Sequence, residues 1–280
     1  MTNLIRKTRR RLGDIRRHVR ARPARTQKQK ANLLRRTSLD QHQQALLEKT
    51  ESRISPKDGM YKGDGDHYFG VGLSAIECIN AALSGSNLPE PKRILDLPCG
   101  HGRVLRFLVN RFPESAITAC DLDTDGVDFC TETFDVSGAY SRVDLATLSL
   151  ADSFDLIWCG SLITHLDETR IVALMKFFDQ HLSQNGLLFF TAAGDRVRDR
   201  MWTREFDYGI AKTVIPEMVE SYRKEGYAYT DYPYMADYGV SLTSPEWIRS
   251  RIVEIGKLRE VFFAKHGWDN HQDVYGFIKS

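Results

Sequence analysis

The sequence has few of the features that place a protein in a membrane, in an oxidising compartment or around a metal ion. No apolar run approaches the length of a transmembrane helix, and the N-terminus lacks the continuous apolar core of a secretion signal. The five cysteines, at positions 78, 99, 120, 130 and 159, include no Cys-x-x-Cys pair, and His and Asp show no clear metal-ligand spacing. We therefore expect a cytoplasmic protein with reduced thiols and no metal.

Charge is distributed unevenly along the chain. The net charge is only +2, but residues 1–36 contain fourteen Lys and Arg and a single acid, Asp14. We divide the chain into a basic N-terminal segment (1–50), a segment that precedes the first strand (51–92) and an α/β domain (93–280). A solvated, partly disordered tail is the first interpretation of the basic segment. The second interpretation is a helix that binds an anionic membrane peripherally through Leu4, Ile5, Leu12, Ile15 and Val19. Nucleic-acid binding is the third, because the segment has few aromatic residues that could stack on bases.

The most informative stretch runs from Arg93 to Leu108. A short apolar run ends at Pro98-Cys99-Gly100-His101-Gly102, and apolar residues then recur at helical spacing as far as Pro113. This pattern predicts a strand, a glycine turn and a helix. Glycines let the backbone approach a ligand closely, and the helix N-terminus directs free N–H groups at it. The stretch therefore indicates a site for a nucleotide-like ligand.

Two absences narrow the choice of ligand. Leu105 stands where a dinucleotide fingerprint has its third glycine, and no Walker lysine follows the turn. The next apolar run ends at Asp121, nineteen residues after Gly102, where an acid would reach a pair of ribose hydroxyls. A nucleoside without phosphates fits this combination.

At this point the chain resembles the class I S-adenosylmethionine-dependent methyltransferases, over roughly residues 91–280. Their first motif, acid-x-Gly-x-Gly-x-Gly, is similar to residues 96–102 except that Pro98, which lacks an N–H, replaces the first glycine. The resemblance implies a Rossmann-like α/β fold: a seven-stranded, mostly parallel sheet with helices on both faces and an antiparallel last strand. It also implies cofactor contacts from the turn and from the ends of the next three strands, namely from Asp96, Cys99, Gly100, Gly102, Asp121, Leu122, Asp144, Leu145 and Cys159.

Periodicity places the remaining elements. We expect helices over residues 68–83, 168–182 and 245–255. Asn185-Gly186 should end the helix at 168–182, and Ser244 should be the N-cap of the helix at 245–255. Asp123 is the expected N-cap of a helix after the second strand. Further strands are expected at about 139–143, 154–159, 187–191, 258–265 and 273–279. Ligands of such parallel sheets lie beyond the carboxyl ends of the strands.

The candidate catalytic groups are histidines. His165 follows the fourth strand and could take a proton from an acceptor hydroxyl, although it could equally hold its loop by hydrogen bonds. His271, in the link between the last two strands, is the reserve candidate. Cys99 lies in the cofactor turn, so we expect it to pack rather than to act as a nucleophile.

The acceptor is indicated only by class. Tyr61 and His67 before the first strand, and Arg196 in a Tyr- and Arg-rich insertion at 194–243, are expected to line the substrate site, although a packed lid or an oligomer contact would explain the insertion as well. We expect methyl transfer to oxygen of a small-molecule or saccharide-like acceptor. The alternatives are a protein or RNA methyltransferase guided by the basic segment, and an inactive binding module.

Overall fold

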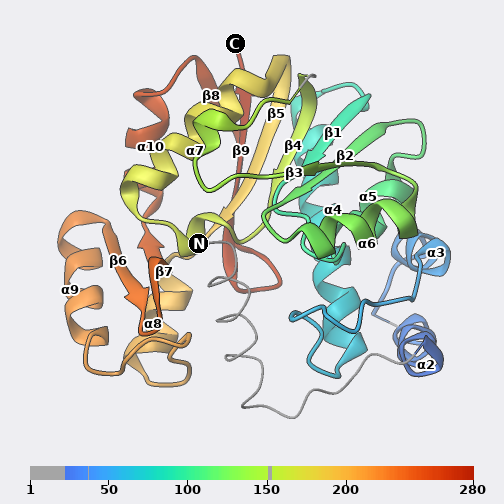
Figure 1. Ribbon diagram of the computed structural model, residues 1–280, viewed down its shortest axis with the longest axis horizontal. Helices are drawn as coiled ribbons and strands as arrows, with labels where there is room; N and C mark the ends of the chain where they lie inside the picture. Colours follow the sequence, from blue (N-terminus) through green and yellow to red (C-terminus); the bar gives the residue numbers. More distant parts are fainter. Residues whose placement is uncertain (1–22, 37, 151–152) are drawn as a thin grey trace. The chain divides into compact units, whose positions relative to one another are not determined.

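The computed structural model describes residues 23–36, 38–150 and 153–280 (Figure 1). The helix predicted around Leu4 to Val19 lies outside these ranges. The described chain divides into two compact units, the first ending at Ser141 and the second containing Arg142–Ser280. None of the described helices is both long and apolar enough to cross a bilayer.

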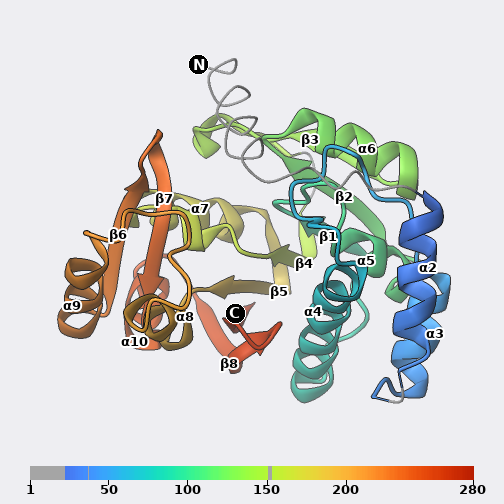
Figure 2. The same ribbon diagram turned by 90° about the horizontal axis from the view of Figure 1, so that it is seen from below.

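The first unit is built on three parallel strands, with Asp96 level with Ala119 and Asp121 level with Tyr140. Its elements are α2 (Pro23–Leu34), α3 (Gln41–Lys49), α4 (Gly65–Ser86), β1 (Arg93–Asp96), α5 (Leu105–Arg111), β2 (Ala116–Asp121), α6 (Thr124–Phe134) and β3 (Ser137–Tyr140). Leu105, at the position of the missing glycine, is fully buried in the core. Figures 1 and 2 both show α2 and α3 side by side.

The second unit continues the alternation of strands and helices. Its elements are η1 (Leu145–Thr147), β4 (Phe154–Cys159), η2 (Ile163–His165), α7 (Glu168–His181), β5 (Leu182–Ala192), α8 (Asp195–Trp202), α9 (Ile215–Glu225), β6 (Tyr227–Tyr232), β7 (Met235–Thr243), α10 (Pro245–Val253), β8 (Leu258–Trp268) and β9 (Gln272–Lys279). β4 and β5 are parallel, and β9 runs antiparallel to both β5 and β8. Residues 187–190 of β5 are fully buried, which explains their unbroken apolar run.

The strands form one seven-stranded sheet in the order β3-β2-β1-β4-β5-β9-β8, together with a two-stranded sheet, β6-β7. The expected Rossmann-like class, with a mostly parallel sheet and an antiparallel last strand, is confirmed. The insertion contributes α8, α9, β6 and β7, which gather as one group in Figure 1. They share a core of their own that includes Met201, Val219 and Leu242.

Two local predictions are wrong, and a third, Asp123 as an N-cap, is confirmed in position. Asn185 does not stop a helix, because it lies inside β5 with a φ of +62°. The register between β4 and β5 shifts next to Phe154, and a Cβ on Gly186 would lie 2.9 Å from Phe154 O. β3 ends at Tyr140 because Asp144 caps η1 by accepting from Ala146 N at 3.1 Å. Asp123 begins α6, as predicted, but makes no capping hydrogen bond with its side chain.

Candidate active site

The turn after β1 is held open by its glycines and by an aspartate. Gly100 and Gly102 have φ values of +53° and +77°, in the left-handed region that favours glycine. Gly100 N donates to Asp121 Oδ2 at 2.8 Å, and Asp123 N donates to the other oxygen, Oδ1, also at 2.8 Å. Because a carboxylate oxygen can accept more than one hydrogen bond, these contacts orient Asp121 without excluding a ligand hydroxyl.

Two features of this turn are typical of a ligand site. A Cβ built on Gly100 would meet no heavy atom within 4 Å, so there is space directly beside the backbone. The Asp96 side chain is 1% exposed, and neither of its oxygens has a hydrogen-bond partner within the described part of the chain. Burial, and then repulsion from Asp121, raises the pKa of Asp96 well above its usual range. A ligand with hydrogen-bonding groups would relieve this buried, unsatisfied carboxyl group.

The other residues predicted near the turn differ in exposure. Leu122 is 49% exposed and offers an apolar surface directly after Asp121. The Cys99 thiol is buried, and its hydrogen bond with Cys130, together with burial, raises its pKa far above the usual range. Such a thiol stays protonated and is a poor nucleophile.

Arg106 is a buried cation that we did not predict. Its Nε donates to Gly102 O at 2.9 Å, and Nη1 donates to the carbonyl oxygens of Glu51 (2.7 Å) and Arg53 (3.0 Å). The guanidinium also lies over the ring of Tyr68, 5.2 Å from its centroid. Arg106 therefore ties the cofactor turn to the segment that precedes the first strand. An arginine among the apolar residues of α5 was the only signal in the sequence.

Two predicted substrate residues of that segment have different environments. Tyr61 is buried, its hydroxyl donates to Gln29 Oε1 at 2.7 Å and its ring meets Tyr68 edge to face. His67 is exposed in the first turn of α4, where its N–H donates to Asp64 Oδ1 at 3.1 Å. The substrate role of both residues stays a prediction.

In the second unit, the segment after β4 is braced by a hydrogen-bond network. Ser161 has a φ of +62°, and its N–H donates to Thr191 Oγ1 at 2.8 Å. Gln272 joins the two, since its Nε2 donates to Ser161 Oγ at 2.9 Å and its Oε1 accepts from Thr191 Oγ1 at 2.6 Å. Cys159 is buried at the end of β4, and Leu145 is half-buried in η1 after the exposed Asp144.

His165 lies at the end of η2, and a hydrogen-bond partner indicates which of its ring nitrogens carries the proton. Nδ1 is 2.9 Å from Gly239 O, which can only accept, so Nδ1 carries the proton of the neutral ring. The Tyr232 hydroxyl is 3.1 Å from the same nitrogen, and Tyr238 stacks on the ring with centroids 4.9 Å apart. The basic lone pair is therefore on Nε2. This arrangement suits a general base and also fixes the loop.

His271 has a different environment. Arg200 Nη1 donates to its Nδ1 at 3.2 Å, and the Tyr208 hydroxyl is 3.4 Å from its Nε2. Burial, and then the charges of Arg200 and Arg196, lower its pKa from 6.5 to about 4. The ring is thus neutral at pH 7, with both nitrogens in use, which suits a hydrogen-bonding role better than proton abstraction.

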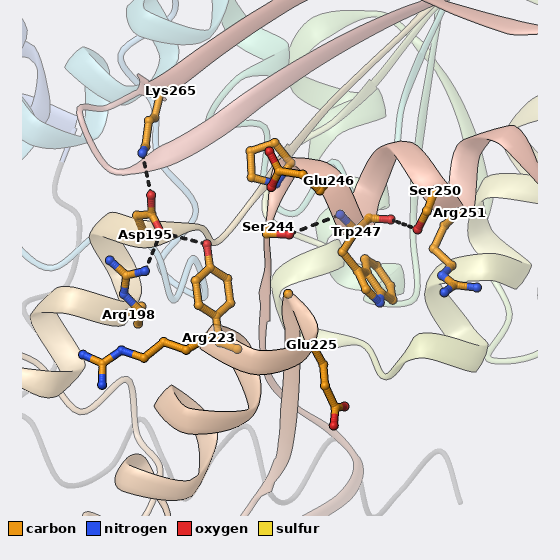
Figure 3. A pocket seen from close by; sticks show the side chains of 13 residues that line it. Asp195, Arg198, Arg223, Glu225, Ser244, Glu246, Trp247, Ser250, Arg251 and Lys265 are labelled. Atoms are coloured by element: carbon orange, nitrogen blue, oxygen red, sulfur yellow. Dashed lines mark hydrogen bonds and ion pairs between the residues drawn. The ribbon is translucent and has the colours of Figure 1, made fainter.

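An open cavity of about 690 Å³ also lies in the second unit, beside α8, α9 and the start of α10 (Figure 3). At its wall, Asp195 accepts from Arg198 Nη1 at 2.6 Å, from the Tyr222 hydroxyl at 3.0 Å and from Lys265. Arg251, also on the wall, forms ion pairs with acidic residues. These mutual pairings account for most of the cavity's positive charge, so we assign it no ligand.

Comparisons with known proteins agree with the fold. Residues 94–186 match a family model described as a methyltransferase domain. A malonyl-[acyl-carrier protein] O-methyltransferase of Bacillus cytotoxicus is 32% identical over 105 residues, which are 37% of this chain and 36% of that relative. A fatty-acid O-methyltransferase of Mycolicibacterium smegmatis is 37% identical over 70 residues, 24% of this chain and 26% of the relative. The chain thus spans well under half the length of these curated relatives.

Solved structures extend the likeness beyond the matched segment. An S-adenosylmethionine-dependent methyltransferase from Clostridium acetobutylicum superposes with a TM-score of 0.52 at 16% identity, over 74% of this chain and 91% of that one. Residues 94–186 form a methyltransferase domain, and the fold is that of the S-adenosylmethionine-dependent methyltransferases.

Proposed function

We propose that this chain moves the methyl group of S-adenosylmethionine by direct displacement to an oxygen atom of a small-molecule or saccharide-like acceptor. The observation that supports it most is the turn after β1, where there is open space beside Gly100, the Gly100 N–H donates to Asp121, and the buried carboxyl group of Asp96 has no hydrogen-bond partner in the described part of the chain. S-adenosylmethionine supplies a methyl group already activated on a sulfonium. The chain's task is therefore to bind, to orient and to exclude water.

The cofactor contacts are proposed residue by residue. Asp121 would hold the ribose hydroxyls, and Gly100 with Gly102 would let the cofactor approach the backbone. Asp144 and Leu145 would flank the adenine. Family resemblance supports the last assignment, whereas hydrogen bonds and burial within the turn support the first.

For a hydroxyl acceptor, His165 is the proposed base. Its Nδ1–H is held by Gly239 O, so Nε2 would receive the acceptor's proton as the oxygen forms its bond to the methyl carbon. The relatives support oxygen as the acceptor atom, because two of them are named as a malonyl-[acyl-carrier protein] O-methyltransferase and a fatty-acid O-methyltransferase. The same names support a small acceptor or a small group presented on a carrier.

Calorimetric titration of the purified chain with S-adenosylmethionine and S-adenosylhomocysteine tests the cofactor site. We expect micromolar binding by the wild type and none by Asp121→Ala. Asp128→Ala is the matched control, because Asp128 is an exposed acid on α6 whose side chain accepts from Tyr140 and not from the turn. A folded wild type that binds neither compound would refute the proposal.

A further inference from the structure

Four polar side chains form a cluster between α8 and the turn that joins β8 to β9. Arg200 donates to His271 on one side of the imidazole, and Tyr208 contacts it on the other. The Tyr208 ring also stacks on the imidazole, with centroids 5.6 Å apart. Arg196 lies one helical turn before Arg200, on the same side of α8. We call Arg196, Arg200, Tyr208 and His271 the α8 cluster.

The α8 cluster contains more positive charge than its neighbours neutralise. Arg200 pairs with Glu205, Nε to Oε1 at 2.9 Å. Arg196 forms no ion pair with any residue that the structure describes, and its buried Nε has no hydrogen-bond partner there. Like charges four residues apart on a helix repel, and a buried N–H group without a hydrogen-bond partner is costly. An anion bound at the cluster would relieve both penalties.

The remaining charges of α8 are accounted for by other contacts. Arg198, on another side of the helix, pairs with Asp195 and Asp199 at 2.6 and 2.7 Å. Figure 3 shows Asp195 interacting with both Arg198 and Lys265 at the wall of the cavity, and no residue of the α8 cluster lines that cavity. Of the three arginines of α8, Arg198 and Arg200 therefore have acidic partners and Arg196 has none within the described part of the chain.

The α8 cluster lies at the edge of the sheet where ligands are expected. His271 directly precedes Gln272, whose side chain bonds to Ser161 and Thr191. Ser161 follows β4 and Thr191 is near the end of β5, so the turn that carries His271 is fastened to the carboxyl ends of both strands. In α/β folds this edge holds the ligand.

We propose that the α8 cluster binds the carboxylate of the methyl acceptor, which is accordingly a small organic acid. This inference rests on the proposed function and specifies its substrate class. Guanidinium groups match a carboxylate with paired hydrogen bonds, and the Tyr208 hydroxyl, which accepts from neutral His271, has its own proton to donate. Phosphate shares this chemistry, but the malonyl and fatty-acid names of two relatives favour a carboxylate.

The test is calorimetry on the full chain saturated with S-adenosylhomocysteine, titrated with sodium malonate, inorganic phosphate and neutral malonamide. We expect saturable binding of malonate, weaker binding of phosphate and none of malonamide. Arg196→Gln and Arg200→Gln should each weaken malonate binding by about tenfold, the effect of losing one charge-assisted hydrogen bond. Arg198→Gln removes the same charge from the same helix and should bind malonate as the wild type does.

Three results would overturn the inference: malonamide binding as tightly as malonate, phosphate binding more tightly, or Arg196→Gln binding malonate unchanged. S-adenosylhomocysteine affinity is measured for every variant, and a folded variant retains it. Absent malonate binding with normal S-adenosylhomocysteine binding refutes the carboxylate site and leaves the proposed function intact. Absent S-adenosylhomocysteine binding by the wild type refutes the proposed function instead, and titration of the cofactor-free chain then decides on the α8 cluster.

Discussion

Arg106 Nε donates to the carbonyl oxygen of Gly102 at 2.9 Å, which places a fully buried cation directly under the cofactor turn. Two further carbonyl oxygens, of Glu51 and Arg53, accept from Nη1. A buried charge is tolerated only when its donors are satisfied, and here backbone oxygens satisfy them. The shape of the turn therefore depends on a segment some fifty residues earlier in the chain.

We expect Arg106→Leu to lower the free energy of unfolding by roughly 3 kcal/mol, because it removes the donor of three hydrogen bonds and leaves the carbonyl oxygens of Gly102, Glu51 and Arg53 without that partner. S-adenosylhomocysteine affinity should fall as well, since Gly102 loses its brace. Urea unfolding and calorimetry measure the two effects. Arg111→Leu is the control, because Arg111 reaches an exposed partner, Glu90. Equal losses in the two variants would contradict the prediction.

Gly100→Ala should abolish S-adenosylhomocysteine binding while costing about 1 kcal/mol of stability, the usual penalty for a side chain at positive φ. The added methyl group would occupy the open space beside the turn without striking protein. Gly70→Ala is the matched control, because its Cβ also meets nothing within 4 Å but lies on α4. Calorimetry decides: retained affinity in Gly100→Ala would mean that the ligand does not approach there.

The sheet was predictable because its signals are local. Strands β1, β2 and β4 are short apolar runs, and Gly100, Gly102 and Asp121 carry a motif whose spacing alone indicates a nucleoside. The error at Asn185 shows the limit of such reasoning. Asn185 has a positive φ inside a strand, and Gly186 leaves room for Phe154 O, a tertiary contact that the dipeptide alone does not reveal.

The candidate acceptor site was less predictable for the same reason. Arg196, His165 and His271 were singled out one by one, but nothing in the sequence indicates that Arg200 and Tyr208 bond to His271. These partners are 71 and 63 residues away along the chain. Long-range pairing of polar side chains has no periodicity, so composition could only suggest a polar insertion.

His165→Gln distinguishes a hydroxyl acceptor from a carboxylate acceptor. If a hydroxyl accepts the methyl group, loss of the base should lower kcat by about 10²-fold or more with little change in the KM for S-adenosylmethionine. If the carboxylate itself accepts it, no proton has to move and kcat should change by only a few-fold. Transfer of radiolabelled methyl groups to a panel of hydroxy acids and simple acids measures this. Tyr238→Phe, which keeps the stacked ring, is the control.

The stability of the fold should depend on the neutrality of His271. Its pKa falls from 6.5 to about 4 on folding, first because of burial and then because of Arg200 and Arg196. A depressed histidine pKa means that the unfolded chain binds the extra proton more readily, so this contribution is fully present above pH 6.5 and is lost progressively as the pH falls toward 4. We expect His271→Asn to flatten the decline of stability between these pH values, as measured by urea unfolding.

Malonate should change the pH dependence of stability that His271 causes. An anion bound at the α8 cluster screens His271 from both guanidinium groups and should raise its pKa, so the wild type's stability should fall less steeply with acid when malonate is present. Arg196→Gln removes one of the charges that lower the pKa of His271, beside those of Arg200 and His266, and should raise that pKa without any ligand. NMR titration of the histidine ring protons follows both shifts. If His271 titrates near 6.5 in the wild type, the ring is not buried among cations, and the carboxylate assignment loses its geometric basis.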